Sequence, residues 1–144
     1  MPQASRAHSY LCFDFGLKRF GVAVGTDLLK TASELKPISA KDGIPDWSII
    51  ELLVDTWKPD GFVVGLPLNM DGSPSDMSLR ATKFGKRLKG RFNKSVSMMD
   101  ERLSSFEAKA YVKEKTNRYV DFGDHSVDGA AACLILESWF ASAQ

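Results

Sequence analysis

A strand that ends in a carboxylate is the feature that most constrains this chain. A first strand is predicted up to Asp14, a glycine-containing turn follows, and a second strand covers 20–25, all within the segment LCFDFGLKRFGVAVG. An acidic residue is rare in an apolar strand unless it is paired, bound to a metal or catalytic. The pattern therefore predicts a β-hairpin whose first strand presents Asp14 to a partner elsewhere in the chain.

Length and composition indicate one globular domain. With 144 residues the chain can bury a core without disulfides, and its net charge of +1 requires any basic binding surface to be local. Cys12 and Cys133 each lie in an apolar run, which favours buried, reduced thiols. No apolar stretch is long enough to span a bilayer and no signal-peptide core precedes the domain, so we expect a cytoplasmic protein without membrane contact.

Predicted strands and helices alternate along the chain, after an N-terminal tail (1–9) and within a single domain (10–142). Three further strands are expected after the hairpin, at 34–41, 62–64 and 95–101. Four helices are expected, at 47–57, from residue 73, from residue 104 and at 126–140. The order β-β-β-α-β-α-β-α-α predicts an α/β fold with a mixed five-stranded sheet flanked by helices.

Local signals place the helix ends. Asp46 is the predicted cap of the first helix, whose apolar residues recur at helical spacing: Trp47, Ile50, Leu53, Val54 and Trp57. Ser73, followed by Pro74, is the predicted cap of the second helix. Ser104 and Glu107 form a capping box for the third helix. The last helix is apolar almost all round, so we expect it to be largely buried.

Three acidic residues stand at the ends of strands or the start of a helix: Asp14, Glu101 and Asp128. Each has an ordinary explanation, because Asp14 suits a turn, the helix dipole favours Asp128, and Arg102 can neutralise Asp100 or Glu101. Taken together they predict a shared site, since open α/β sheets place their sites at the carboxyl ends of strands. Carboxylate oxygens suit Mg²⁺ or Mn²⁺, and two such ions about 4 Å apart form a clamp for phosphoryl transfer.

Five further residues are candidates for holding a nucleic-acid substrate, with Arg102 beside the acids as a sixth. Lys18 and Arg19 lie in the turn after Asp14, and Asn69 lies in a turn-rich loop. Lys83 and Arg87 belong to a basic run on the second helix that can bind a phosphate backbone. The ordinary alternatives are solvated charges at a hairpin tip, a plain strand-to-helix loop and a solvated helix face.

Four blocks of the chain resemble the YqgF (RuvX) family in order and spacing: FDFGLKRFGVAVG, VVGLPLNMDGS, DERLSSFEA and VDGAAACLILES. The family is similar to the RuvC Holliday junction resolvases and has a ribonuclease H-like fold. The resemblance covers residues 11–140 and implies a bacterial cytoplasmic nuclease in ribosome biogenesis, which processes the 5′ end of precursor 16S ribosomal RNA. A Holliday junction resolvase role has also been proposed for the family.

Carried over block by block, the resemblance implies that Asp14, Glu101 and Asp128 are the catalytic, metal-binding acids. The chain departs from the family before Asp128, where a basic stretch is common and this sequence has GDHS at 123–126. This difference leaves open how the loop would contact the phosphate backbone of a nucleic acid. It also makes Asp124, like Asp100, a candidate further ligand.

The leading hypothesis is therefore a metal-dependent endonuclease acting on structured RNA. A DNA junction resolvase uses the same metal chemistry, and recognition of the 2′-OH depends on surface details that the motifs do not contain. A non-catalytic nucleic-acid-binding module is a third possibility. The first block also resembles the phosphate loop of the actin and sugar-kinase superfamily, but those ATPases need two such domains. The oligomeric state, monomer or homodimer, stays open, although symmetric junctions favour dimers.

Overall fold

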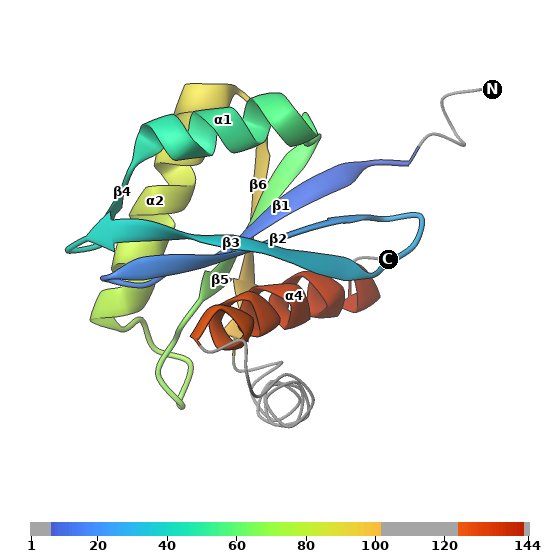
Figure 1. Ribbon diagram of the computed structural model, residues 1–144. Helices are drawn as coiled ribbons and strands as arrows, with labels where there is room; N and C mark the ends of the chain where they lie inside the picture. Colours follow the sequence, from blue (N-terminus) through green and yellow to red (C-terminus); the bar gives the residue numbers. More distant parts are fainter. Residues whose placement is uncertain (1–6, 102–123, 143–144) are drawn as a thin grey trace.

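Six strands form one mixed sheet in the order β4-β3-β2-β1-β5-β6 (Figure 1). The computed structural model describes residues 7–101 and 124–142, the side chains of 124–128 excepted. The strands are β1 (Ser9–Asp14), β2 (Arg19–Thr26), β3 (Ala32–Lys41), β4 (Ile44–Pro45), β5 (Gly61–Leu66) and β6 (Ser95–Asp100). The prediction of five strands was wrong by one, because the two-residue β4 pairs only with the end of β3 and has no periodicity of its own.

The first two strands form the hairpin that the sequence predicts. β1 and β2 are antiparallel, with Asp14 opposite Gly21 at the end next to the turn. β1 begins at Ser9, a residue expected in the N-terminal tail, and the Ser9 amide donates to Asp60 (2.8 Å). On its other side β1 runs parallel to β5, and β5 runs parallel to β6.

Within residues 7–101 and 124–142, three helices cover the sheet: α1 (Trp47–Trp57), α2 (Asp76–Phe92) and α4 (Asp124–Ser142). Asp46 caps α1 as predicted, since its carboxylate accepts from the Ser48 amide at 3.0 Å. The cap of α2 is Ser75 rather than Ser73, because the Ser73 hydroxyl donates to Asp71 within the preceding loop. None of the described helices is long and apolar enough to cross a membrane. The helix predicted from Ser104 lies outside the described residues.

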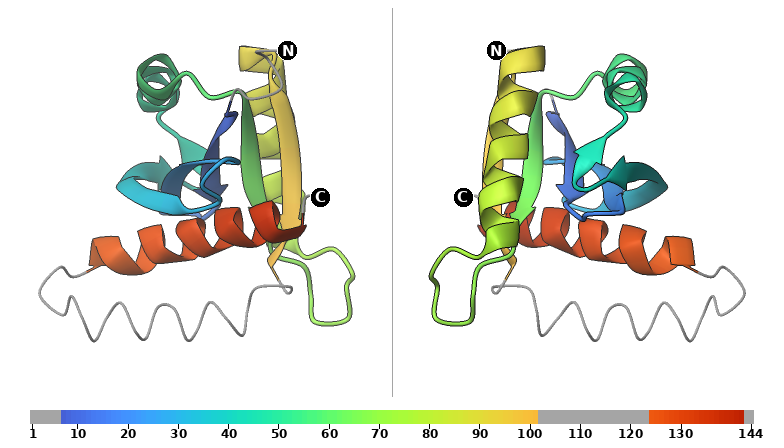
Figure 2. Two further views of the ribbon diagram at one scale, coloured as in Figure 1. Left: turned by 90° about the vertical axis from the view of Figure 1, so that its right-hand side faces the viewer. Right: turned by 90° about the vertical axis from the view of Figure 1, so that its left-hand side faces the viewer.

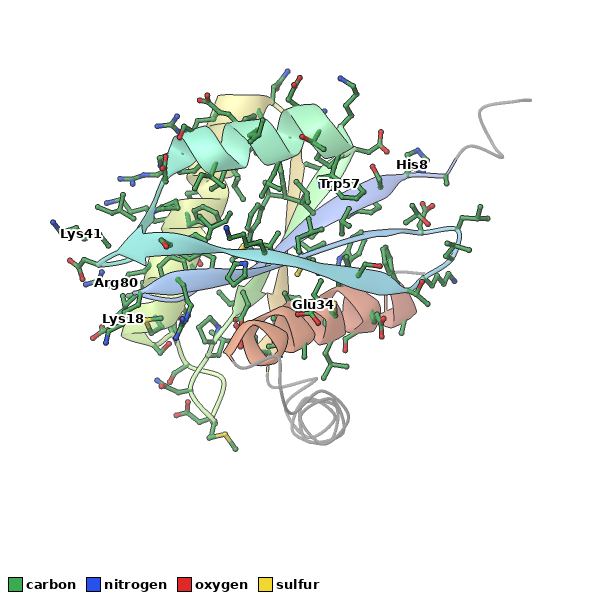
Figure 3. All side chains as sticks on the ribbon, viewed as in Figure 1. His8, Lys18, Glu34, Lys41, Trp57 and Arg80 are labelled. Carbon is green, nitrogen blue, oxygen red and sulfur yellow. The ribbon has the colours of Figure 1, made fainter. Side chains whose placement is uncertain are left out.

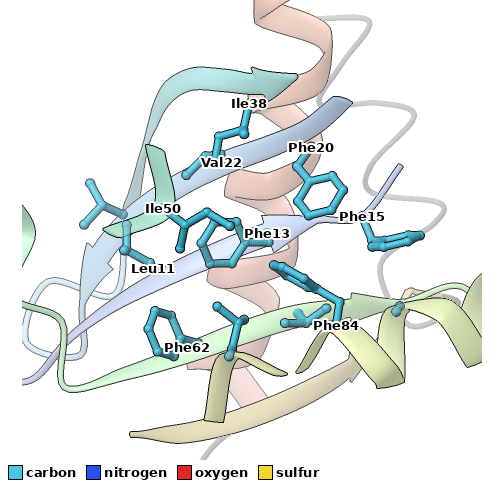
Figure 4. Packing of buried hydrophobic residues seen from close by; sticks show 13 residues of the cluster. Leu11, Phe13, Phe15, Phe20, Val22, Ile38, Ile50, Phe62 and Phe84 are labelled. Carbon is cyan, nitrogen blue, oxygen red and sulfur yellow. The ribbon is translucent and has the colours of Figure 1, made fainter. Parts of the chain in front are cut away.

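Helices cover both faces of the sheet (Figure 2), and each face carries its own core. α1 and α2 pack on one face over a cluster rich in phenylalanine, which includes Phe13, Phe20, Phe62 and Phe84 (Figure 4). α4 packs on the other face over mainly small and aliphatic residues, with an aromatic cluster of Tyr10, Trp139 and Phe140 near the end of the helix. Cys12 and Cys133 lie in this second core as buried free thiols, as predicted.

One apolar position of α1 departs from the prediction. Trp57 was expected on the buried face of the helix, but 42% of the residue is exposed. It is the last helical residue before Lys58, which adopts a left-handed conformation (φ 47°) and ends the helix. The helical spacing that places Trp57 on the apolar stripe does not show that contact with the core ends one turn earlier, at Leu53 and Val54.

Candidate active site

Asp14 and Glu101 are brought to the same edge of the sheet by three neighbouring strands. The parallel pairing of β1 with β5 places Phe13 beside Val64, so Asp14 is level with Gly65. The pairing of β5 with β6 places Leu66 beside Asp100, and Glu101 is the next residue. Because all three strands run parallel, their carboxyl ends share one edge, the usual place for a site in such a sheet.

The carboxylate of Glu101 lies directly over the backbone of Gly65. A Cβ atom built on Gly65 would be 2.6 Å from Oε2 of Glu101 and 2.9 Å from Cδ1 of Ile135 in α4. Any side chain at position 65 would therefore displace the carboxylate or the helix. Oε2 of Glu101 is itself buried, so this acid is held in a cradle between β5 and α4.

Asp14 belongs to the same face of the sheet as Glu101. Successive residues of a strand point to opposite faces, and Phe13 and Phe15 belong to the core under α1 and α2 while Cys12 belongs to the core under α4. Asp14 is two residues from Cys12 and so is on the α4 side. The two acids thus lie on the same face of the sheet and at the same edge.

The electrostatics of the site reflect this crowding. Burial, and secondly the charge of Asp100, raise the pKa of the Glu101 carboxyl group above its ordinary value. Burial raises the pKa of the Cys12 thiol well above its ordinary value, and the nearby charges of Asp14, Cys133 and Glu101 add to that shift. A cation between the acids would lower both pKa values, because a nearby positive charge favours the ionised carboxylate and the ionised thiolate.

Asp128 is placed by its helix. α4 covers the face of the sheet that carries Asp14 and Glu101, and position 128 lies seven residues, or about two turns, before Ile135. The adjacent Gly129 packs against the side chain of Glu34 in β3, which is labelled beside α4 in Figure 3. The side chain of Asp128 is outside the described residues, as are those of Asp124 and Arg102. Among the side chains that are described, no group of three metal-ligating residues occurs.

The predicted substrate contacts fall into two groups. Lys18 and Arg19 are exposed in the turn and strand that follow Asp14, at the same edge as the acids. Lys83 and Arg87 are exposed on α2, across the sheet from α4, so the structure does not bring them into the acidic site. Asn69 uses its side-chain amide within its own loop, where it donates to Ser73 Oγ (3.0 Å) and to the Pro74 carbonyl (3.1 Å). That contact favours the structural explanation for Asn69.

One residue that shapes the site was missed from the sequence. Gly65 interrupts the buried run of β5, and a glycine inside a strand often marks a close approach of another group. Here that group is the Glu101 carboxylate. The interruption was visible in the segment VVGLP, but nothing in the sequence identified which side chain approaches it.

A family model described as the RuvX Holliday junction resolvase matches residues 8–142. The chain belongs to the RuvX family. A protein of Hahella chejuensis named "Putative pre-16S rRNA nuclease" is 58% identical over 127 residues, which cover 88% of this chain and 80% of that protein. This relationship confirms the resemblance expected from the four sequence blocks.

Solved structures of resolvases share the fold. The fowlpox virus Holliday junction resolvase matches with a TM-score of 0.59 at 12% identity, over 94% of this chain and 99% of that one. Thermus thermophilus RuvC in complex with a Holliday junction substrate matches with a TM-score of 0.55 at 14% identity, over 89% and 91%. The predicted ribonuclease H-like fold of the family is therefore confirmed, and the relatives and the fold together support a nuclease.

Proposed function

We propose that this protein is a metal-dependent endonuclease that hydrolyses phosphodiester bonds in RNA, at the 5′ end of precursor 16S ribosomal RNA in the cytoplasm. The observation that carries the proposal is the placement of Asp14 and Glu101 on one face and at one edge of the sheet, at the carboxyl ends of parallel strands, with Glu101 over Gly65. The naming of close relatives as pre-16S rRNA nucleases supports the choice of RNA.

The donor set fits Mg²⁺ or Mn²⁺. Both ions prefer carboxylate oxygens, and the absence of a side chain at Gly65 leaves room for the Glu101 carboxylate. These two residues, with Asp128 from α4, would hold the metal. When bound, the metal activates water and stabilises the charge on the transferring phosphate.

The chain itself positions the reacting groups. Packing between β5 and Ile135 fixes Glu101, and the β1–β2 pairing fixes Asp14 where its strand ends. The exposed cations Lys18 and Arg19 lie beyond Asp14 and can hold phosphates that flank the scissile bond. Arg102, next to Glu101 in the sequence, is proposed for the same role.

A second candidate substrate is a four-way DNA junction, because the matching family model is described as a Holliday junction resolvase. The two substrates make different demands on assembly. A four-way junction is approximately two-fold symmetric, so its resolution calls for a dimer, whereas a single cut in ribosomal RNA needs one active site.

The test compares both substrates in one assay. A fragment spanning the 5′ end of precursor 16S ribosomal RNA and a four-way DNA junction are incubated with the protein in Mg²⁺, Mn²⁺ or EDTA. We expect cleavage of the RNA with either metal and none in EDTA. Symmetric cuts in the junction by a dimer, without RNA cleavage, would favour the second candidate, and RNA cleavage that persists in EDTA would exclude the metal mechanism.

A further inference from the structure

A cavity of about 330 Å³ lies on the face of the sheet opposite α4, between α2 and the turn that joins β3 to β4. Its volume is in the range of small-ligand sites. Three cations of α2, Arg80, Lys83 and Arg87, stand around an apolar wall that includes Ile44 and Trp47. The acidic site does not use this cavity, since Asp14 and Glu101 belong to the other face.

The three cations form one stripe, because residues three and four apart on a helix are neighbours. Like charges at this spacing repel, so the arrangement does not serve the stability of α2. Arg80 is partly neutralised by Asp42, whose carboxylate is 3.5 Å away and whose carbonyl accepts from the guanidinium at 3.3 Å. Within the described part of the chain, neither Lys83 nor Arg87 makes an ion pair. Two cations are thus available to an anion in the cavity.

The apolar wall indicates that the ligand is more than a bare anion. Ile44 is 57% exposed although it is a large aliphatic residue, and Trp47 is only half-buried. One face of the Trp47 ring is covered by the Arg91 guanidinium, 4.2 Å from the ring centre. A ligand with an anionic group and a flat apolar group fits this combination, and a nucleotide has both.

The cavity opens at the same edge of the sheet as the acidic site. Phe15 lines it, and Phe15 directly follows Asp14 in the chain. The β3–β4 turn is fixed to the β1–β2 turn by the Gly43 amide, which donates to the Leu17 carbonyl at 2.9 Å. Figure 3 shows Lys18, Lys41 and Arg80 on this side of the molecule. A strand that leaves the acids can therefore pass Lys18 and reach the cavity around the edge of the sheet.

We propose that this cavity holds one unpaired nucleotide of the RNA strand that is cut at Asp14 and Glu101, an inference that rests on the proposed function. The phosphate of this nucleotide contacts Lys83 and Arg87, and its base contacts Ile44. The nucleotide must be unpaired, because a base inside a duplex is stacked and cannot reach the apolar wall. The protein would accordingly prefer RNA with a single-stranded segment near the cleavage site.

The test measures binding without cleavage, with a labelled single-stranded RNA oligonucleotide in EDTA at several salt concentrations. We expect the double variant Lys83→Ala, Arg87→Ala to lose about 10-fold in affinity and to lower the salt slope by about 0.7, the contribution of the one phosphate that both cations contact. The matched control, Lys86→Ala with Lys89→Ala, removes the same charge from the same helix outside the cavity. It should lose clearly less affinity, and equal losses would overturn the proposal.

Two single variants separate the phosphate from the base. Asp42→Asn releases Arg80 from its carboxylate and should tighten oligonucleotide binding. Ile44→Ala should weaken binding of the single strand without changing its salt slope, and should leave binding of blunt duplex RNA unchanged. An Ile44→Ala variant that binds single-stranded RNA as the wild type does would refute the base contact.

Two further arms identify the source of the nucleotide and separate this inference from the proposed function. The first arm measures binding of free AMP. If AMP binding requires Lys83 and Arg87 but oligonucleotide binding does not, the cavity is assigned to a free nucleotide and the strand proposal is overturned. Cleavage of precursor RNA with unchanged kcat/KM in the Lys83→Ala, Arg87→Ala variant would also overturn it, and would leave the nuclease function standing. If the Lys83→Ala, Arg87→Ala variant specifically loses single-strand binding while the wild-type protein cleaves no RNA, only the nuclease function is refuted.

Discussion

The two faces of the sheet differ in the size of the side chains that cover them. Under α1 and α2 the rings interlock, with Phe84 centred 5.5 Å from Phe13 and 4.8 Å from Phe20. Under α4 the buried residues include Ala23, Ala132 and Cys133, together with aliphatic side chains. Because β1 alternates between these faces, Phe13 and Asp14 are neighbours in sequence but belong to different parts of the molecule. The aromatic face supplies most of the large buried side chains, whereas the α4 face carries the acids.

The largest expected effect tests the aromatic face. Phe62 is 1% exposed and its ring packs against Phe13 and Phe92, away from both the acids and the cavity. Phe62→Ala should lower the free energy of unfolding by about 3–5 kcal/mol, through lost transfer energy and the cavity left behind. Urea denaturation followed by circular dichroism measures this loss.

The milder Phe62→Leu variant guards against complete unfolding. It should lose less stability than Phe62→Ala, while RNA cleavage per folded molecule stays near that of the wild type. A large loss of turnover in folded Phe62→Leu protein would show that the aromatic face also controls the chemistry, and would break the contrast between the two faces.

The second prediction is that a substitution on the α4 face lowers RNA cleavage and leaves stability intact. Asp14→Asn keeps the shape of the side chain but removes the charge that a metal needs, so RNA cleavage should fall by about 100-fold or more. Stability should stay the same or rise, because repulsion between Asp14 and Glu101 is relieved. Single-turnover cleavage in Mg²⁺ and urea denaturation measure the two quantities on the same preparation.

Asp55→Asn is the matched control, since Asp55 is an exposed aspartate on α1, which covers the face of the sheet opposite the acids. It should leave both cleavage and stability near the wild-type values. Equal cleavage by the Asp14→Asn protein and this control would remove Asp14 from the set of essential ligands.

The sequence predicted those parts of the fold that depend on periodicity. The apolar run that ends in Asp14 located β1, and the helical spacing of apolar residues located α1 and α2. It did not distinguish Ser73 from Ser75 as the cap of α2, because both serines precede the helix and only the loop contacts of Asp71 and Asn69 decide between them. Local pattern carries no information about which hydroxyl is already engaged.

For the site, the sequence identified the acids but not their surroundings. The placement of Asp14 and Glu101 at one edge of the sheet followed from the rule for carboxyl ends of parallel strands. The role of Gly65 depends on the parallel register of β5 with β6, and the cavity depends on the β3–β4 turn reaching α2. Both are contacts between segments distant in the chain, which a motif does not encode. The roles of Asp14, Glu101 and Asp128 as catalytic metal ligands stay predictions.

The third prediction concerns the cradle of Glu101. Gly65→Ala adds a methyl group 2.6 Å from Oε2 of Glu101 and 2.9 Å from Ile135, so the carboxylate or α4 has to shift. Overpacking of this kind costs about 1–3 kcal/mol, and a displaced metal ligand should reduce cleavage as well. Thermal unfolding and cleavage rates measure the two losses. Wild-type cleavage by a stable Gly65→Ala protein would show that the position of Glu101 is not critical.

The smallest effect has the opposite sign and serves as the control for Gly65. Gly90 lies in α2 with nothing within 4 Å of a Cβ atom built on it. A Cβ on Gly85, which is buried in the same helix, would be 3.0 Å from Sδ of Met98. Glycine loses more backbone conformational entropy on folding than alanine does. Gly90→Ala should therefore raise the free energy of unfolding by up to about 1 kcal/mol. Gly85→Ala should gain less or lose stability, because the Met98 side chain has to move. If urea denaturation shows Gly90→Ala to be as destabilising as Gly65→Ala, loss at Gly65 reflects substitution of glycine in general, and the steric account of the Glu101 cradle is wrong.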